Sequence, residues 1–205
     1  MLKNALNSLN LSITDQQVDL FEQYIELLSK WNKTYNLSAI REKELMYPYH
    51  LYDSLSIAPY VTKNHIIDVG SGAGLPGIPL AILFPNKQIK LLDSNIKKSR
   101  FQRQVMLELN LNNVEVIHKR VEAYQPSMQF DYVISRAFSS LKQMLSLCQH
   151  LLKADGEYLA MKGINPTDEI KALKAQTNLD IKTIKLNVPR LEASRHLLII
   201  KPNKT

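Results

Sequence analysis

The sequence contains a single cysteine and no long apolar run, and each scarcity excludes a class of protein. One cysteine, Cys148, rules out a disulfide-stapled scaffold and argues against a zinc site built from cysteines. The longest apolar stretch, around residues 78–84, is interrupted by Pro79 and is too short to cross a bilayer. The first seven residues lack the apolar core of a signal peptide. Together these features predict a cytoplasmic protein that does not enter the membrane.

The overall composition is that of an ordinary globular protein. The chain has 205 residues, of which 45% are hydrophobic and 22% are charged. This length suits one domain with an appendage, and it is large enough to bury a core without covalent staples. Lys and Arg number 26 against 19 for Asp and Glu, which gives a net charge of +7. That excess favours a polyanionic partner, while a charge that only keeps the protein soluble is the alternative.

Residues 1–63 carry the pattern of helices. Thr14 precedes an amphipathic stretch and Gln17 follows three residues later, which is the spacing of a capping box. Apolar side chains then recur on one helix face, at Val18, Phe21, Ile25 and Leu28. A second, shorter helix is predicted over residues 43–60, broken near Pro48 and Pro59 because proline has no backbone N–H to donate.

From residue 64 onward, predicted strands alternate with predicted helices. Short apolar runs indicate strands at residues 66–69, 89–93, 114–117, 132–134 and 158–161, and helical segments lie between them at 79–84, 97–109, 141–152 and 168–176. This alternation predicts a parallel α/β sheet. The last two strands, 181–188 and 196–201, follow each other without a helix, so they are expected to form an antiparallel hairpin. We therefore expect a helical extension over 1–63 and a Rossmann-like unit with a mostly parallel, seven-stranded sheet over 64–205.

A glycine-rich segment follows the first predicted strand and precedes a helix. It runs from Asp68 to Gly77 and reads Asp-Val-Gly-Ser-Gly-Ala-Gly-Leu-Pro-Gly. Glycines at such a place let the backbone turn sharply and approach a ligand closely. Asp93 ends the next strand, where a carboxylate can accept both ribose hydroxyls of a nucleoside. Together these features predict a nucleoside site, and a tight turn beside a surface carboxylate is the structural alternative.

The position of Asp68 bears on which nucleoside binds. The glycines formally match the dinucleotide fingerprint, but a carboxylate directly before them would oppose a pyrophosphate. Asp68 suits a cationic ligand better, and S-adenosylmethionine carries an ammonium and a sulfonium without any phosphate. The strand, the acidic residue and the glycines resemble the pattern of class I S-adenosylmethionine methyltransferases, whose sheet also ends in an antiparallel hairpin. An NAD-dependent oxidoreductase is the alternative from a different class.

A closer resemblance emerges from a series of motifs that occur in order along the chain. The chain resembles the bacterial RsmG family, also called glucose-inhibited division protein B, from about Leu20 to Lys201. The motifs are Asn32-Lys33-x-Tyr35-Asn36-Leu37, His50-x-x-Asp53-Ser54, the glycine segment continued through Ile78-Pro79, Leu92-Asp93-Ser94, Arg120-Val121-Glu122, Ile134-Ser135-Arg136-Ala137, Lys162-Gly163 and Arg195-His196. The Gly-Leu-Pro-Gly-Ile-Pro continuation is far more specific than a bare glycine loop.

This resemblance implies methylation of N7 of guanine 527, in the 530 loop of 16S rRNA, with S-adenosylmethionine as methyl donor. It further implies a monomer that meets its RNA within the small ribosomal subunit. The implied cofactor-binding residues lie at or near carboxyl ends of strands, where ligands bind in open α/β sheets. They are Asp68, Gly70, Gly72, Gly74, Leu75, Asp93, Val121, Glu122 and Arg136. A methyltransferase acting on another RNA or on a small molecule is the alternative within the same class.

Four basic residues near strand ends are candidates for the catalytic site. They are Arg120, Arg136, Lys162 and Arg195, with Arg136 the strongest because it follows a buried-looking strand. Guanine N7 is an unprotonated lone pair at neutral pH, so no general base is needed and the enzyme mainly has to align the reacting atoms. An arginine would grip guanine O6 or a phosphate and leave N7 free.

Among the remaining residues, only a few are candidates for function. Lys33, Tyr35 and Arg41 are candidates for additional RNA contacts, whereas the basic run 97–103 is interpreted as a solvated helix face. His50 and Asp53 lack a third ligand at useful spacing, so helix-packing hydrogen bonds are expected there and no metal is predicted. Cys148 and Trp31 are expected in the core. A non-enzymatic RNA-binding module is disfavoured because no aromatic RNA-binding strand signature is present.

Overall fold

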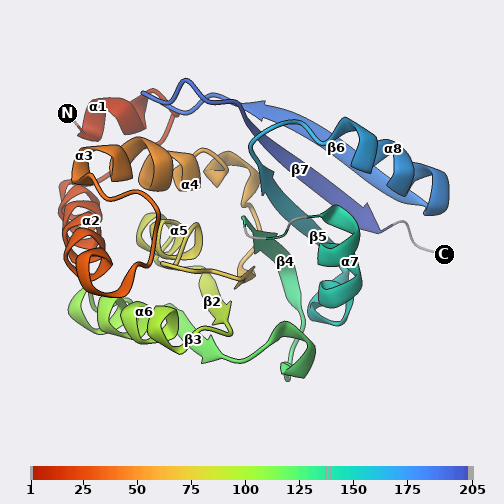
Figure 1. Ribbon diagram of the computed structural model, residues 1–205, viewed down its shortest axis with the longest axis horizontal. Helices are drawn as coiled ribbons and strands as arrows, with labels where there is room; N and C mark the ends of the chain where they lie inside the picture. The colour runs from red at the N-terminus through yellow and green to blue at the C-terminus, as the bar shows by residue number, and fades with distance from the viewer. Residues whose placement is uncertain (1, 137, 139, 203–205) are drawn as a thin grey trace.

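The computed structural model describes residues 2–136, 138 and 140–202, and its centre is a seven-stranded sheet (Figure 1). The strand order is β3-β2-β1-β4-β5-β7-β6. The first five strands pair in parallel, whereas β7 runs antiparallel to both β5 and β6. The bounds are β1 His65–Val69, β2 Gln88–Asp93, β3 Val114–His118, β4 Phe130–Ser135, β5 Leu152–Lys162, β6 Leu179–Leu186 and β7 Arg195–Pro202. The predicted parallel sheet with a final antiparallel hairpin is confirmed.

Helices cover both faces of this sheet. On one side lie α5 (Gly77–Leu83) and α6 (Ile96–Glu108), and on the other lie α7 (Leu141–Cys148) and α8 (Thr167–Gln176) (Figure 1). Successive strand residues face opposite layers, as the two-residue period of a strand requires. Ile66 joins the core on the α5 and α6 side, and Ile67 joins the core on the α7 and α8 side. Cys148 is fully buried in the second core, as predicted.

The N-terminal segment is helical and shares the first core with the sheet. It comprises α1 (Leu2–Asn7), α2 (Asp15–Tyr35), α3 (Lys43–Met46), a π-helix over Tyr47–Tyr52, α4 (Asp53–Leu55) and a 3-10 turn over Ala58–Tyr60. The predicted capping box is present, since the Gln17 amide donates to Thr14 Oγ1 at 3.2 Å and the Thr14 amide donates to Gln17 Oε1 at 3.0 Å. Fully buried Phe21, Ile25 and Leu28 form the predicted stripe. None of the described helices is long and apolar enough to cross a membrane.

Two sequence-based predictions of element boundaries are wrong. The expected break at Pro48 is instead a π-helix continuous with α3 and α4, because the wider turn can accommodate the proline ring, which in an α-helix would crowd the carbonyl four residues earlier. The helical segment expected over 141–152 is an α-helix to Cys148 and a 3-10 turn over Gln149–Leu151, and β5 begins at Leu152 rather than near Tyr158. The early start of β5 depends on an irregular register, in which Phe130 pairs with Leu152 but Tyr132 pairs with Glu157.

Candidate functional site

The glycine loop leaves β1 in a conformation that needs glycine. Gly70, Gly72 and Gly74 have φ values of 70°, 60° and 83°, in the left-handed region. A Cβ on Gly74 would also lie 2.2 Å from Ile78 Cδ1, so this residue combines a special backbone with a close approach. The amides of Gly70 and Ser71 donate to the Leu92 carbonyl at 2.8 and 3.2 Å. These bonds hold the loop against the end of β2.

Asp93 joins the glycine loop to the start of α6. Its Oδ2 accepts a hydrogen bond from the Gly72 amide at 2.8 Å, and its Oδ1 accepts one from the Asn95 amide at 2.8 Å. Asp93 is only 7% exposed, yet it lines a cavity beside the loop. Each carboxylate oxygen has a second lone pair, so this role in the loop leaves acceptors for a ligand hydroxyl.

Asp68 lies beneath the loop and does not line the cavities at the carboxyl edge of the sheet. It is 1% exposed, and its Oδ2 accepts a hydrogen bond from the Gly77 amide at 2.8 Å. Its Oδ1 is buried without a hydrogen-bond partner among the described residues. Burial raises the pKa of Asp68 to about 7, although the Gly77 N–H and the charge of Arg136 oppose that rise. A buried carboxylate oxygen without a partner is suited to a donor or a cation supplied by a ligand.

Three adjoining cavities run along the carboxyl edge of the sheet. The first, about 310 Å³, is lined by Gly70, Asp93, Arg120, Val121 and Glu122 together with neighbouring residues. The second, about 240 Å³, is lined by Gly70, Gly72, Leu75, Lys98 and Arg136 among others. The third, about 330 Å³, is lined by Arg136, Lys162, Arg195 and His196 among others. Gly70 is common to the first two cavities, and Arg136 and His50 are common to the last two.

The structure therefore brings together most, but not all, of the predicted site residues. Arg136, Lys162 and Arg195 gather around the third cavity, whereas Arg120 stands apart in the first. Lys162 Nζ donates to the Phe138 carbonyl at 3.1 Å and lies 3.9 Å from Glu169. Gly74 supports the loop from behind and lines none of these three cavities. Ala137, which belongs to the Arg136 motif, lies outside the described residues.

Asp53 is the functional candidate that the sequence analysis missed. It follows the π-helix, is 2% exposed, and binds two arginines at once. Arg136 Nη1 donates to Asp53 Oδ2 at 2.9 Å and also to the Tyr49 carbonyl at 3.2 Å, and Arg195 Nε donates to Asp53 Oδ1 at 3.1 Å. The sequence predicts only helix-packing hydrogen bonds for Asp53. Its two arginine partners are distant in the chain, so no local pattern indicates these contacts.

His50 is held as a neutral imidazole between the second and third cavities. Its Nε2 lies 2.7 Å from Ser38 Oγ, and it is 6% exposed. Burial, aided by the positive charge of Arg136, lowers the pKa of His50 to about 4. His50 is therefore uncharged at neutral pH. Among the described residues, no group of three or more His, Cys, Asp and Glu side chains could hold a metal ion.

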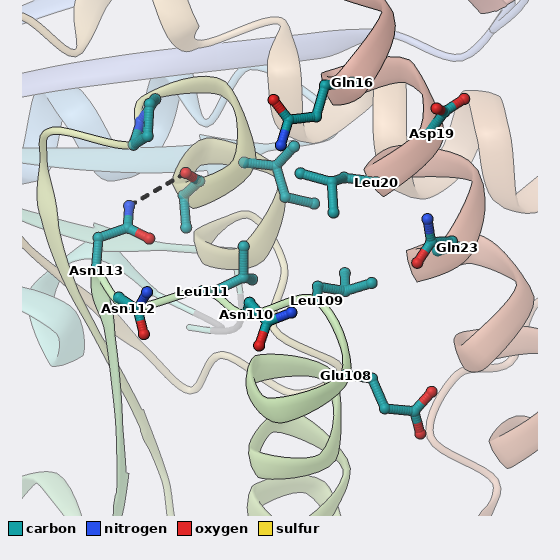
Figure 2. A pocket seen from close by; sticks show the side chains of 13 residues that line it. Gln16, Asp19, Leu20, Gln23, Glu108, Leu109, Asn110, Leu111, Asn112 and Asn113 are labelled. Carbon is teal, nitrogen blue, oxygen red and sulfur yellow. Dashed lines mark hydrogen bonds between the residues drawn. The ribbon is translucent and has the colours of Figure 1, made fainter.

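A cavity larger than these three lies elsewhere. It measures about 540 Å³ and is formed by α2, the end of α5 and the segment that follows α6. Figure 2 shows Gln16 and Leu20 of α2 facing this segment, with Asn113 bonded to the Ala81 carbonyl at 3.1 Å. This segment leads into β3, so the cavity lies towards the amino edge of the sheet. None of the predicted site residues lines it, so its size does not mark the functional site.

With this geometry established, comparison with known proteins gives the family. Residues 17–198 match the family described as GidB, rRNA small subunit methyltransferase G. The chain belongs to this family. A relative from Chromobacterium violaceum, named Ribosomal RNA small subunit methyltransferase G, is 52% identical over 96% of this chain and 94% of its own length. Another of the same name, from Marinobacter nauticus, is 50% identical over 97% of this chain and 92% of its own length. The predicted resemblance is confirmed.

Solved structures agree on the fold of this GidB-family chain. A S-adenosylmethionine-dependent methyltransferase from Aquifex aeolicus matches with a TM-score of 0.58 at 15% identity, over 77% of this chain and 95% of that one. A ribosomal protein L11 methylase from Lactobacillus delbrueckii matches with a TM-score of 0.56 at 18% identity, over 74% and 77%. At such low identity these structures show the fold alone, and they confirm the predicted methyltransferase fold class.

Proposed function

We propose that this protein transfers the methyl group of S-adenosylmethionine to N7 of guanine 527 in 16S rRNA. The observation that carries the proposal is the junction at Arg136, where the nucleoside cavity beside the glycine loop continues into a cavity surrounded by cations. The relatives named Ribosomal RNA small subunit methyltransferase G support rRNA of the small subunit as the substrate. The guanine and its N7 come from the family resemblance of the sequence.

The residues around the first two cavities fit S-adenosylmethionine, the expected cofactor. The cofactor supplies a methyl group on a positively charged sulfur. Asp93 retains free lone pairs for the ribose hydroxyls, and Val121 and Glu122 form the wall expected to meet the adenine. Gly70, Gly72 and Leu75 line the second cavity, where the backbone can approach the rest of the cofactor. Beneath them, the partnerless Asp68 oxygen suits the ammonium group of a methionine moiety.

The third cavity fits the target nucleotide. Asp53 and the Tyr49 carbonyl accept from Arg136 Nη1, while Asp53 and the Ser194 carbonyl accept from Arg195 Nε and Nη1. The guanidinium N–H groups that these bonds do not use are proposed to contact guanine O6 or a phosphate. Lys162 adds a further positive charge. The N7 lone pair forms the new bond to the methyl carbon in line with the departing sulfur, and no proton has to be removed first. Alignment is then the main task, and positioning of this kind can lower a barrier by about 7–11 kcal/mol.

The helical segment 1–63 is proposed to act as an extension that completes this site. Its residues Ser38, His50 and Asp53 contribute to the walls of the second and third cavities, and the rest of those walls comes from 64–205. A cytoplasmic monomer that acts within the small ribosomal subunit stays a prediction from the sequence. Both naked rRNA and assembled small subunits are therefore offered in the test below.

The test is methyl transfer followed by mapping. Purified protein is incubated with radiolabelled S-adenosylmethionine and unmethylated small-subunit rRNA or subunits, and the modified nucleotide is located by mass spectrometry of nuclease fragments. We expect one methyl group at N7 of guanine 527. A chiral methyl donor should deliver its methyl group with inverted configuration, as a single in-line displacement requires. Methylation at another nucleotide would contradict the proposed site, and retained configuration would contradict the mechanism.

A further inference from the structure

Some positive charges on this protein are paired with carboxylates and others are not. Near the amino edge of the sheet, three lysines are paired in this way, and at the carboxyl edge Arg136 and Arg195 are paired with Asp53. Lys63 lies 3.4 Å from Asp155, Lys153 lies 2.7 Å from Asp131, and Lys201 lies 2.8 Å from Glu157. These cations are already neutralised by their neighbours, so they offer little attraction to a polyanion.

A second group of cations, near the carboxyl edge, has no such partners. Lys33, Arg41, Lys97 and Lys98 form no ion pair with a carboxylate among the described residues. The two segments that carry them, 30–41 and 94–107, contain no Asp or Glu. Within the part of the chain that the structure describes, the Arg41 side chain donates to the neutral side chain of Asn36, Nη2 to Oδ1 at 3.2 Å, and to no other group. Their charge is therefore available to an external anion.

An exposed aromatic ring lies at the end of the helix that carries Lys33. Tyr35, at the end of α2, is 42% exposed, which is unusual for a large apolar side chain. Its ring lies 5.1 Å from that of Trp31, and Trp31 in turn lies 5.6 Å from Phe101 of α6. The Tyr35 ring thus packs against Trp31, which in turn packs against Phe101 of α6. These contacts restrain the Tyr35 ring while part of it stays exposed to solvent.

This surface continues directly into the candidate site. The turn after Tyr35 is fixed by Asn32, whose Oδ1 accepts from the Ser38 amide at 2.7 Å and whose Nδ2 donates to the Ile40 carbonyl at 2.8 Å. Leu37 and Ser38 of this turn line the second cavity, as does Lys98. A strand that occupies the site would therefore pass over this surface on leaving it.

We propose that Tyr35, with Lys33, Arg41, Lys97 and Lys98, forms a binding surface for the single-stranded RNA that flanks the target nucleotide. Hereafter these five residues are called the Tyr35 surface. An aromatic ring on which an unpaired base can stack, surrounded by cations that contact phosphates, is the usual design of single-strand binding sites. The proposal rests on RNA as the substrate, which is part of the proposed function. It assigns binding roles to Lys97 and Lys98, which the sequence alone suggested were a solvated helix face.

The experiment measures RNA binding and methyl transfer separately. The probe is an RNA hairpin carrying the 530 loop, and its affinity is measured by filter binding at several salt concentrations. We expect Tyr35→Ala to weaken binding and to raise KM for RNA about tenfold. Tyr35→Phe should stay within about twofold, because it keeps the ring. In both variants the affinity for S-adenosylmethionine, measured by calorimetry, should be unchanged.

A matched charge pair tests the lysines. Lys97→Gln with Lys98→Gln should reduce the slope of log affinity against log salt by about 0.7–1.4, the value for one or two phosphate contacts on a single strand. The control, Lys171→Gln with Lys174→Gln, removes the same charge from exposed positions on α8 and should leave the slope unchanged.

Three results would overturn the proposal. They are unchanged RNA affinity in Tyr35→Ala, an equal loss of slope in the control pair, and an equal loss of affinity for polyglutamate, which would indicate a surface for acidic proteins. A wild-type protein that binds the hairpin through the Tyr35 surface but methylates no rRNA would contradict the proposed function instead. Melting curves verify that each variant is folded, which the exposure of the substituted side chains favours.

Discussion

The hydroxyl of Tyr24 donates a hydrogen bond to the carbonyl of Ala73 at 2.8 Å, inside the protein. Tyr24 lies in the middle of α2 and is fully buried, while Ala73 lies between two left-handed glycines of the glycine loop. The N-terminal segment thus supports the loop from beneath. This contact links the helical segment to the proposed cofactor site through one buried polar interaction.

Removing this hydroxyl is expected to destabilise both the fold and the loop. Tyr24→Phe keeps the ring but leaves the Ala73 carbonyl unpaired, which should lower the free energy of unfolding by about 1–3 kcal/mol. The affinity for S-adenosylmethionine should fall as well, because the loop loses a fixed point. Urea denaturation and calorimetry measure the two effects. Tyr60→Phe is the control, since the Tyr60 hydroxyl bonds to no described residue. Equal stability of the two variants would contradict the expected role.

Asp53 is expected to position both arginines of the third cavity. Asp53→Asn removes the charge that holds Arg136 and Arg195, so the free energy of unfolding should fall by about 1.5–3 kcal/mol. Methyl transfer should fall at least tenfold through a higher KM for RNA, while cofactor affinity stays near that of the wild type. Asp155→Asn removes an exposed carboxylate that pairs only with Lys63, and it should cost less than about 1 kcal/mol. A variant that is less stable but keeps the wild-type rate of methyl transfer and KM for RNA would show that Asp53 has a structural role only.

Arg136 and Arg120 are expected to differ in importance. Arg136→Lys keeps the charge but loses the planar guanidinium, whose Nη1 contacts Asp53 and Tyr49 while its other nitrogens are proposed to face the target nucleotide. Methyl transfer should therefore fall by about 100-fold. Arg120→Lys should change it by less than about fivefold, because Arg120 is exposed and lies outside the third cavity. Labelled methyl transfer to rRNA, with saturating cofactor, provides both values. A larger loss for Arg120→Lys would move the target site to the first cavity.

The buried carboxyl of Asp68 predicts a dependence of stability on pH. Its pKa is raised to about 7 in the folded protein against an ordinary value of 3.8, so the folded state binds more protons between these values. The contribution of Asp68 to stability is therefore full below about pH 4 and is lost as pH rises through about 7. His50, whose pKa is lowered to about 4, contributes the opposite slope to both proteins. Relative to the wild type, Asp68→Asn should therefore gain stability as pH rises from 4 to 7, as measured by urea denaturation. The same pH profile in both proteins would contradict this role of Asp68.

Ionisation of the same carboxyl should affect cofactor affinity in the opposite direction. If Asp68 meets the ammonium group of S-adenosylmethionine, binding should strengthen as pH rises through about 7, because only the carboxylate attracts a cation. Calorimetry at pH 6 and pH 8 on the wild type and on Asp68→Asn tests this expectation. An identical pH dependence in both proteins would place Asp68 outside the cofactor site.

Local patterns in the sequence were enough to predict most of the fold. The capping box at Thr14 and Gln17, the apolar runs of the strands and the glycine loop all depend on residues close together in the chain. The π-helix was not predictable, because proline normally breaks a helix and no sequence pattern distinguishes the wider turn from such a break. Cavity residues at strand ends followed from the rule that parallel strands present their carboxyl ends at one edge.

The role of Asp53 could not be predicted because its partners are distant in sequence. Arg136 lies 83 residues away and Arg195 lies 142 residues away. No periodicity connects them, and nothing in the sequence indicates that Asp53 is buried with two guanidinium groups. The Tyr35 surface was also only partly foreseen. The importance of Lys97 and Lys98 depends on the ion pairs that they do not form, which only the folded arrangement reveals.

The position of β7 has a consequence for how the protein is made. Although β6 is synthesised first, it pairs only with β7, and β7 itself lies between β5 and β6. Until β7 has emerged from the ribosome, β6 has no strand to pair with and one edge of β5 is unpaired. Arg195 opens β7, so Asp53 gains its second arginine only at this late stage. The cation-lined cavity is thus completed by a segment that is translated after the rest of its walls, and a nascent chain would carry the glycine loop before it could hold a target nucleotide.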